Sequence, residues 1–246
     1  SVRDLAASFA ALHGFDPGDP ASVDRPRDAG PDLEAGIGGL RLGLADGYFA
    51  RGGEPGALAA AGELAEALGV TRRVTLPRAV EARAGAMVIT AVEGAHHHRR
   101  SLATRPGDFD PMTRDRFLAG ALAPAGAYLA AQAFREWFRA RMAGVFEEVD
   151  VVIAPATPFW APRVGQREAV VDGETVQTQP YLGVYTQPLS FAGLPVLAAP
   201  VRTGDGLPVG VQLVAGHFQE AALLRVAAEL EARGLTGVAE VAAPWR

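Results

Sequence analysis

The strongest constraint on the fold is a pair of apolar segments near the end of the chain, residues 191–201 and 206–214. Each carries Gly-Leu-Pro near its start and continues in Val, Leu and Ala, a composition that favours buried strands. Only a short polar stretch separates them, which is typical of two strands joined by a tight turn. The chain is therefore predicted to contain a sheet that includes a buried hairpin.

Strands and helices alternate in the preceding part of the chain. Residues 40–44 alternate as a strand, residues 57–68 form an Ala/Leu/Glu-rich helix stopped by Gly69, and residues 73–76 form a second strand. This spacing favours a crossover unit with parallel strands. Residues 150–155 are apolar throughout and predict a fully buried strand. Together these patterns predict an α/β fold in which a mixed sheet is flanked by helices.

The remaining segments divide into helices and loops. Helices are predicted over residues 2–12, with Ser1 as N-cap and Gly14 as terminator, over 78–102, over 113–147 with a bend at Pro124, and over 219–233. Residues 15–39 and a polar, Gln-rich stretch before Tyr181 lack periodicity and are predicted to be loops.

Composition excludes several classes of function. The formal net charge of −5 argues against a basic face that would bind nucleic acid. The sequence also has no uninterrupted apolar run of about 18 residues, the length that a membrane-spanning helix needs. Cysteine is absent, which excludes disulfides and thiolate metal sites and favours an intracellular, cytoplasmic compartment. Lysine is also absent, so no side-chain amine can serve as a general base.

The most conspicuous polar cluster is Glu93 with His96, His97 and His98. Adjacent residues on a helix point about 100° apart, and no His-x-x-x-His pair supplies two ligands from one face. A structural or substrate-contacting helix is therefore favoured over a metal site. A glycine-rich stretch at residues 36–43 precedes a strand instead of following one, which argues against a dinucleotide loop.

Three arginines, Arg105, Arg114 and Arg116, flank two aspartates at positions 108 and 110. Such a group either binds a carboxylate on a substrate or forms local salt bridges at the start of a helix, and the residues alone leave both interpretations open. Ser190 could act as a nucleophile only beside a base, and the sequence specifies none. No complete catalytic constellation is present, and no catalytic residue is predicted.

Three segments taken in order resemble the C-terminal half of amidase signature hydrolases. They are residues 149–158 (Val-Asp-Val-Val-Ile-Ala-Pro-Ala-Thr-Pro), 186–195 (Thr-Gln-Pro-Leu-Ser-Phe-Ala-Gly-Leu-Pro) and 207–213 (Leu-Pro-Val-Gly-Val-Gln-Leu). Residues 14–20 also look like the segment that follows the catalytic region of the family. Residues 108–116, 119–122 and 161–166 look like carboxybiuret hydrolase-type members, relatives of the glutamyl-tRNA amidotransferase A subunit.

This resemblance implies a serine amidase with a Ser–cis-Ser–Lys triad and backbone amides that stabilise the oxyanion. The chain contains neither a lysine nor the Gly/Ser-rich loop of that triad. We therefore expect residues 1–246 to be the C-terminal portion of a single amidase domain, with an incomplete amidase signature-type fold that lacks the N-terminal catalytic half. The whole enzyme is expected to hydrolyse C–N amide bonds of a small, carboxylate-bearing substrate resembling carboxybiuret or a urea derivative.

The resemblance also implies substrate-side residues. Arg116 aligns with an arginine that meets the substrate carboxylate in the amidotransferase relatives, and Thr157, Gln187 and His97 are further pocket candidates. Gly183 replaces an acidic residue of those relatives, so recognition of an ammonium group is not expected. No cofactor and no metal are expected.

Two hypotheses about the working unit remain. The chain is either part of an amidase that is inactive alone, or a non-catalytic subunit or binding protein that needs a partner chain. Partners would be a small-molecule amide substrate and either a second copy or a small accessory subunit, with no nucleic acid or membrane. As half of a sheet, the chain would expose strand edges and apolar helix faces such as Phe134 and Phe138. Alone it is expected to aggregate or to be molten, and not to hydrolyse amides.

Overall fold

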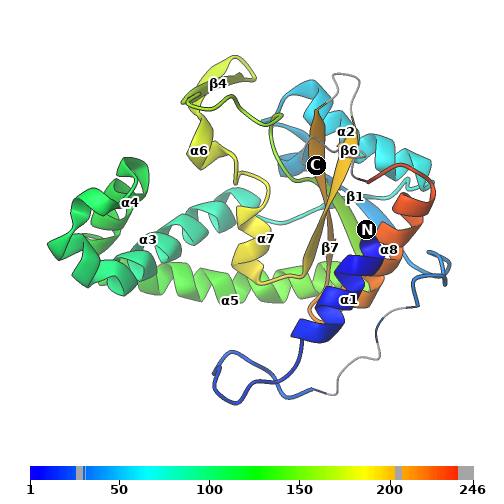
Figure 1. The fold of residues 1–246 in the computed structure, drawn as a ribbon, viewed down its shortest axis with the longest axis horizontal. Coiled ribbons are helices and arrows are strands. Elements are labelled where there is room, and N and C mark those ends of the chain that lie inside the picture. The colour runs from blue at the N-terminus through cyan, green and yellow to red at the C-terminus, as the bar shows by residue number, and fades with distance from the viewer. Residues whose placement is uncertain (26–29, 31, 203–206, 238–246) are drawn as a thin grey trace, which may run out of the picture.

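The computed structural model describes residues 1–25, 30, 32–202 and 207–237. Figure 1 shows a central sheet with helices on both sides and a helical arm that extends away from it. The helices are α1 (Val2–Leu12), η1 (Gly47–Ala50), α2 (Pro55–Ala67), α3 (Ala79–Thr104), η2 (Pro106–Asp108), α4 (Pro111–Ala121), α5 (Ala125–Glu148), α6 (Thr178–Tyr181), α7 (Gln187–Ala192) and α8 (Glu220–Ala232). The strands are β1 (Leu42–Asp46), β2 (Arg73–Thr75), β3 (Val151–Pro155), β4 (Glu168–Val171), β5 (Glu174–Gln177), β6 (Val196–Arg202) and β7 (Pro208–Ala215).

The main sheet has the order β2-β1-β3-β7-β6. Strand β1 runs parallel to both β2 and β3, whereas β7 is antiparallel to β3 and to β6. This arrangement confirms the predicted mixed sheet, the parallel crossover from β1 through α2 to β2, and the antiparallel pairing of the two Gly-Leu-Pro segments. The turn predicted between those segments falls mostly on residues 203–206, which lie outside the described residues.

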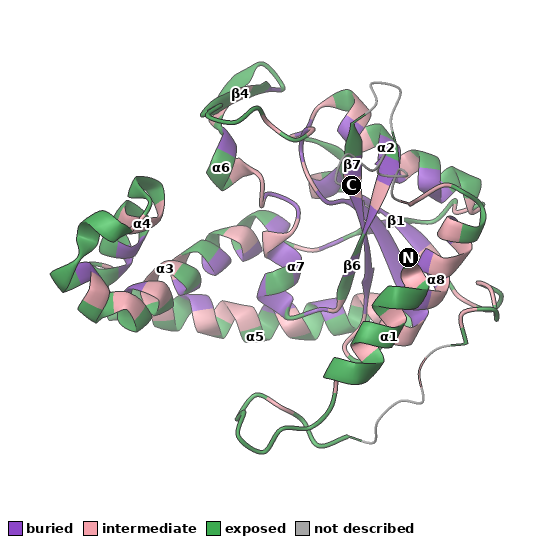
Figure 2. Cartoon of the chain, in the orientation of Figure 1, coloured by how far each residue is buried: buried purple, intermediate pink, exposed green. Residues whose placement is uncertain are grey.

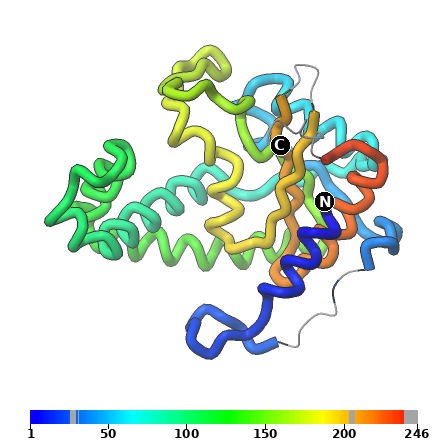
Figure 3. The backbone as a smooth tube through the Cα atoms, in the orientation of Figure 1, coloured from blue at the N-terminus to red at the C-terminus, as the bar shows by residue number. Residues whose placement is uncertain are grey.

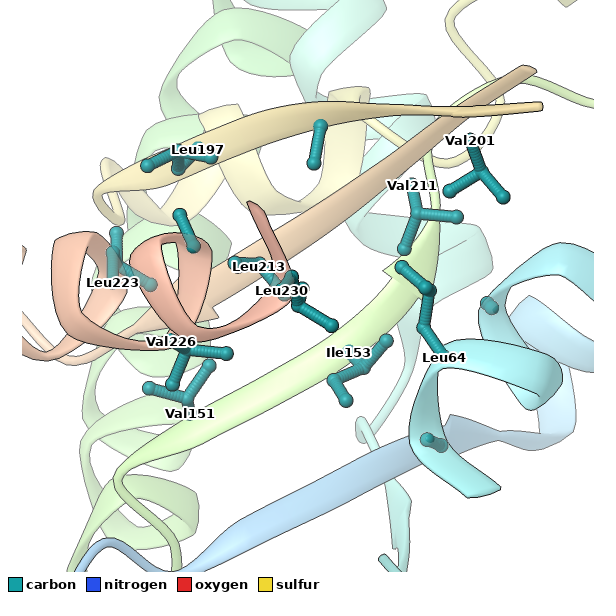
Figure 4. Close-up of a cluster of buried hydrophobic side chains, with 14 of the residues drawn as sticks. Leu64, Val151, Ile153, Leu197, Val201, Val211, Leu213, Leu223, Val226 and Leu230 are labelled. Carbon is teal, nitrogen blue, oxygen red and sulfur yellow. The ribbon is translucent and has the colours of Figure 1, made fainter. Parts of the chain in front are cut away.

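Two hydrophobic clusters cover the two faces of the sheet. On one face, α2 and α8 pack against β3, β6 and β7, with α1 beside α8, as Figures 1 and 3 show. Figure 4 shows the side chains of this cluster, among them Leu64 of α2, Ile153 of β3 and Leu230 of α8. On the other face, α3, α5 and α7 form the second cluster. The sheet is thus the middle layer of three.

Strand β3 contributes to both clusters, which explains its unbroken apolar sequence. Val151 and Ile153 pack in the first cluster, and Val152 and Ala154 pack in the second. Alternate side chains point to opposite faces of a strand, so a strand that is covered on both faces needs an apolar residue at every position. The prediction of a fully buried strand here is confirmed.

The predicted helix over 113–147 is wrong in one respect: it is two helices. Helix α4 ends at Ala121 and α5 begins at Ala125, and their axes differ by 101°. Pro124 is the N-cap of α5. Proline has no N–H to donate within a helix and disfavours helical geometry at the residue before it. The first helix therefore ends before Pro124, and the chain changes direction there. Helix α4 consequently folds back on the outer end of α3 (Figure 1).

The polar stretch predicted to be a loop contains a hairpin, β4–β5. Its turn is Asp172-Gly173, and both residues have positive φ, 51° and 80°. Positive φ at both central positions is the geometry of the type I′ turn, which favours Asp-Gly. The strand predicted from residue 191 also begins later, at Val196, because Phe191 and Ala192 belong to α7 and Gly193 ends that helix at a φ of 71°.

Helix α1 forms as predicted. The Ser1 side chain accepts a hydrogen bond from the Asp4 backbone N–H, and the two residues make a reciprocal capping box. The expected exposure of Phe138 is wrong, since this side chain is fully buried against Phe191 of α7, and Phe134 is half-buried. Figure 2 shows that much of α1 and of the arm around α4 is exposed.

Strands β2 and β6 are the two ends of the main sheet within the described residues. Val196 and Ala198 of β6 are exposed. No single helix in the described ranges has both the length and the hydropathy of a membrane span. Helices α4 and α5 have that length and hydropathy only when they are taken as one segment, and this pair is sharply bent.

Candidate substrate-binding site

One face of α3 carries several polar side chains, among them Glu93 and His97 of the cluster noted in the sequence. Arg83, Ala86, Thr90, Glu93 and His97 follow one another at steps of three and four residues, the spacing that brings residues onto one side of a helix. The Ala-rich composition of α3 favours the helix and keeps this side open. The same side faces α5 and α7, which pack against α3 in the second cluster.

A cavity of about 220 Å³ lies between α3, α5 and α7. It is hereafter called the inner cavity, and its lining residues are Ala86, Ile89, Thr90, Glu93, Arg135, Gln187, Ser190 and Phe191. Drug-sized ligands occupy pockets of roughly 300–1,000 Å³. The inner cavity therefore suits only a small molecule, and its lining supplies both hydrogen-bond donors and an acceptor.

Two opposite charges line the inner cavity without forming an ion pair. Arg135 of α5 donates from Nε to the Phe191 carbonyl oxygen at 2.9 Å. Glu93 of α3 accepts from the Tyr128 hydroxyl at 2.8 Å and from Gln132 Nε2 at 3.4 Å. Neither charge has an ion-pair partner among the described residues. A ligand with an oxygen acceptor and an N–H donor would complement this pair.

Gln187, at the start of α7, is held by Arg83. Arg83 donates from Nε to Gln187 Oε1 at 2.9 Å and from Nη2 to the Pro180 carbonyl at 3.2 Å. Its guanidinium carbon lies 5.7 Å from the centre of the Tyr181 ring, within the range of a cation–π contact. These contacts fix the guanidinium, which in turn fixes the Gln187 side chain at the cavity wall.

Buried tyrosines hold the segment that precedes α7. The Tyr185 hydroxyl donates to the Arg51 carbonyl at 2.7 Å, and the Tyr181 hydroxyl donates to the Gly52 carbonyl at 3.1 Å. Gln212 of β7 donates from Nε2 to the Tyr185 carbonyl at 3.1 Å. Burial raises the pKa of both tyrosines above the ordinary value, so the phenols stay neutral donors. The start of α7 is therefore tied to the sheet and to the loop after η1.

A second cavity of about 760 Å³ adjoins the first, since both are lined by Thr90 and Glu93. This outer cavity is also lined by His96, His97, His98 and Tyr128. His98 stacks on Phe117 of α4 with ring centres 5.3 Å apart, which supports a structural role for that ring. No group of three or more His, Asp or Glu residues within the described ranges could hold a metal ion.

The four residues expected from the sequence are placed differently. Gln187 lines the inner cavity and His97 lines the outer one, and the two cavities share Thr90 and Glu93 in their linings. Arg116 is exposed on α4, where its guanidinium lies 5.3 Å from the Phe117 ring centre, and it lines neither cavity. Thr157 follows β3, is half-buried and also lines neither cavity.

For two of the three arginines near the start of α4, the structure decides between binding a substrate carboxylate and forming local salt bridges. Arg105 pairs with Asp108 at 3.3 Å and Arg114 with Asp115 at 2.9 Å, while Asp110 caps α4. These are the local salt bridges of a helix start. Arg116 is the arginine of the three for which no ion pair forms within the part of the chain that the structure describes.

Sequence reasoning missed Arg83 and Arg135. They lie on different helices and meet near α7 only in the fold, so no local motif links them. The three-to-four spacing of Arg83, Thr90, Glu93 and His97 was the available signal, because it places polar side chains on one side of a long helix. Ser190 lines the inner cavity, and no hydrogen bond to a base is formed by its side chain within the described residues.

The chain is similar over most of its length to known proteins. The chain is 43% identical to AtzE, a 1-carboxybiuret hydrolase subunit of Pseudomonas sp. (strain ADP), over 238 residues, which is 96% of this chain and 52% of that protein. It is 32% identical to the A subunit of the glutamyl-tRNA(Gln) amidotransferase of Azotobacter vinelandii, over 92% of this chain and 52% of the relative. The chain spans about half the length of both.

Solved structures of amidase-type proteins also superpose on most of this chain. One, described as a vestigial protein complex that reveals the evolutionary origins of an s-triazine catabolic enzyme, superposes with a TM-score of 0.93 at 42% identity, over 97% of this chain and 53% of that one. A crystal structure of an amidase superposes with a TM-score of 0.78 at 26% identity, over 95% of this chain and 51% of that one. These structures confirm an amidase signature-type fold that is present in part. The family model described as Amidase matches residues 1–224, and the chain belongs to the amidase family of hydrolases.

Proposed function

We propose that this chain forms the substrate-binding side of a serine amidase that hydrolyses a C–N amide bond in a small, carboxylate-bearing urea derivative such as a carboxybiuret. The observation that carries the proposal is the inner cavity, where Arg135 and Glu93 face a small space without pairing to each other. A carboxylated urea offers carbonyl and carboxylate oxygens to the arginine and N–H groups to the glutamate, so both charges gain a partner on binding.

The relatives support the choice of substrate class. The Pseudomonas relative is named as part of a carboxybiuret hydrolase, and it is the more similar of the two relatives compared above. In the proposed enzyme Gln187 binds a substrate oxygen in the inner cavity, and His97 contacts the outer part of the substrate. Arg116 and Thr157 line neither cavity, and a role for them in substrate binding rests on the resemblance to the family alone.

The hydrolytic machinery of the proposed enzyme is not supplied by these residues. The family triad requires a lysine, and the sequence has none. A serine nucleophile activated by that lysine would attack the amide carbonyl, amine would leave, and water would then release the acid from the acyl-enzyme. In the proposal the triad belongs to another segment or chain, and this chain alone is inactive. A partner chain is consistent with the protein complex described for the structural relative.

The test is reconstitution of hydrolysis. The 246-residue chain is mixed with the N-terminal half of the Pseudomonas relative, and ammonia release from 1-carboxybiuret is measured. We expect ammonia from the mixture but from neither half alone. Hydrolysis by the 246-residue chain by itself, or none in a mixture shown by gel filtration to associate, would contradict the proposal.

A further inference from the structure

Arg83 is a half-buried cation on α3 with no acidic partner among the residues described. Its hydrogen bonds go instead to two neutral oxygens, Gln187 Oε1 and the Pro180 carbonyl. Removing a charge from water without an opposite charge nearby costs folding free energy. Arg83 contacts Gln187, a lining residue of the inner cavity, and this contact orients the Gln187 amide.

The chemistry of arginine decides how the Gln187 amide is turned. A guanidinium has only donors, so the atom that Arg83 contacts must be the carbonyl oxygen Oε1. The remaining polar group of the amide is its NH₂, for which no partner is found within the described part of the chain. Gln187 therefore offers donors, and not its acceptor, to a ligand in the inner cavity.

Gly183 makes this orientation possible. A Cβ at position 183 would lie 3.1 Å from Cγ, Cδ and Nε2 of Gln187, closer than an ordinary contact. A side chain at this position would force the Gln187 side chain to shift by a few tenths of an ångström. Gly183, Gln187 and Arg83 thus act together, and this set is called the amide lock.

Building on the proposed function, we propose that the amide lock determines specificity: Arg83 is a positioning residue that keeps Gln187 a donor, so the inner cavity selects a ligand with a carboxylate at this end and rejects one with an ammonium. Without Arg83 the amide can rotate by half a turn and present Oε1 to an N–H group. Arg135, which lines the same cavity, adds a second donor to the carboxylate.

The test compares two ureas that differ at one end. N-carbamoylglycine carries a carboxylate and (2-aminoethyl)urea an ammonium, and their Kd values for the 246-residue chain are measured by calorimetry. We expect the carboxylate probe to bind at least tenfold more tightly. We expect this ratio to fall at least fivefold in Arg83→Met and to be largely kept in Arg83→Lys, since lysine still donates to Oε1.

Loss of a positive charge would by itself weaken anion binding, so a neutral change is needed. Gly183→Ala leaves every charge in place and displaces Gln187, and we expect it to lower the ratio as Arg83→Met does. Gly144→Ala, where an added Cβ meets no atom of the described part of the chain within 4 Å, should leave the ratio unchanged. Circular dichroism of each variant checks that the fold is kept.

Three outcomes would overturn the proposal: equal binding of the two probes, binding of neither, or a wild-type ratio in both Arg83→Met and Gly183→Ala. The readout is binding and not turnover. If the ratio shifts as expected while reconstitution yields no ammonia, the amide lock stands and the proposed hydrolysis is wrong. If ammonia is released but the ratio does not shift, the proposed hydrolysis stands and the amide lock is wrong.

Discussion

The substitution Gly120→Ala tests how α4 is attached to the rest of the molecule. A Cβ at position 120 would lie 2.9 Å from the Val92 nitrogen and closer still to the Ala91 carbonyl, against 3.4–4 Å for ordinary contact. Both obstacles are backbone atoms of α3, which cannot rotate away as a side chain can. The two helices would have to separate by roughly 1 Å, and overpacking of this kind costs about 1–3 kcal/mol.

Gly144→Ala provides the comparison, because it makes the same chemical change in the interior of another helix. Among the described residues nothing lies within 4 Å of a Cβ added at position 144, so the expected effect is the higher helix propensity of alanine, a gain of about 0.5–1 kcal/mol. The two variants should therefore differ in free energy of unfolding by about 1.5–4 kcal/mol, with opposite signs relative to wild type.

The assay is urea unfolding followed by tryptophan fluorescence, at concentrations where the midpoint does not depend on concentration. Hydrogen exchange of the α4 amides shows whether α4 separates before the rest unfolds. Equal stability changes in the two variants, or a stabilised Gly120→Ala protein, would refute the inference that α3 and α4 meet backbone to backbone at this point.

Three further substitutions test the fold. Phe138→Ala should cost about 3–5 kcal/mol in urea unfolding, because it removes a fully buried ring from the second cluster, and a cost below about 1 kcal/mol would contradict that burial. Hydrogen bonds from Arg41 hold the pKa of Asp150 below its ordinary value, so the stability that Asp150 contributes is present above about pH 4 and is lost as the pH falls through the lowered pKa. Asp150→Asn should accordingly melt at a lower temperature than wild type at pH 7, with the two converging in acid; a constant difference would disprove the link. We expect the wild-type chain to associate through the exposed edge strand β6, and Val196→Lys to shift its mass by light scattering toward the monomer; a wild-type monomer would argue against this.

The sequence indicated those parts of the fold whose patterns are local. The continuous apolar run of β3 and the paired Gly-Leu-Pro segments correspond to real strands because burial on both faces demands such residues. The β4–β5 hairpin was missed since polar composition outweighed a two-residue turn signal, Asp172-Gly173, that was present. Pro124 was noted, but only the packing of α4 against α3 shows that the chain reverses there.

The site was less accessible to such reasoning. Gln187 and His97 were expected from resemblance and do line the two cavities, but Arg83 and Arg135 approach α7 from separate helices. Their proximity depends on how α3 and α5 cross the sheet, which no window of the sequence encodes. These placements define two alternative positions for the substrate carboxylate, the exposed Arg116 on α4 and the inner cavity.

The most direct measurement is a crystal structure of the chain with N-carbamoylglycine bound. The account predicts that the ligand lies in the inner cavity, with its carboxylate beside Gln187 Nε2 and Arg135 and its urea nitrogens toward Glu93. A ligand seated on Arg116 at the surface of α4, with the inner cavity empty, would contradict it.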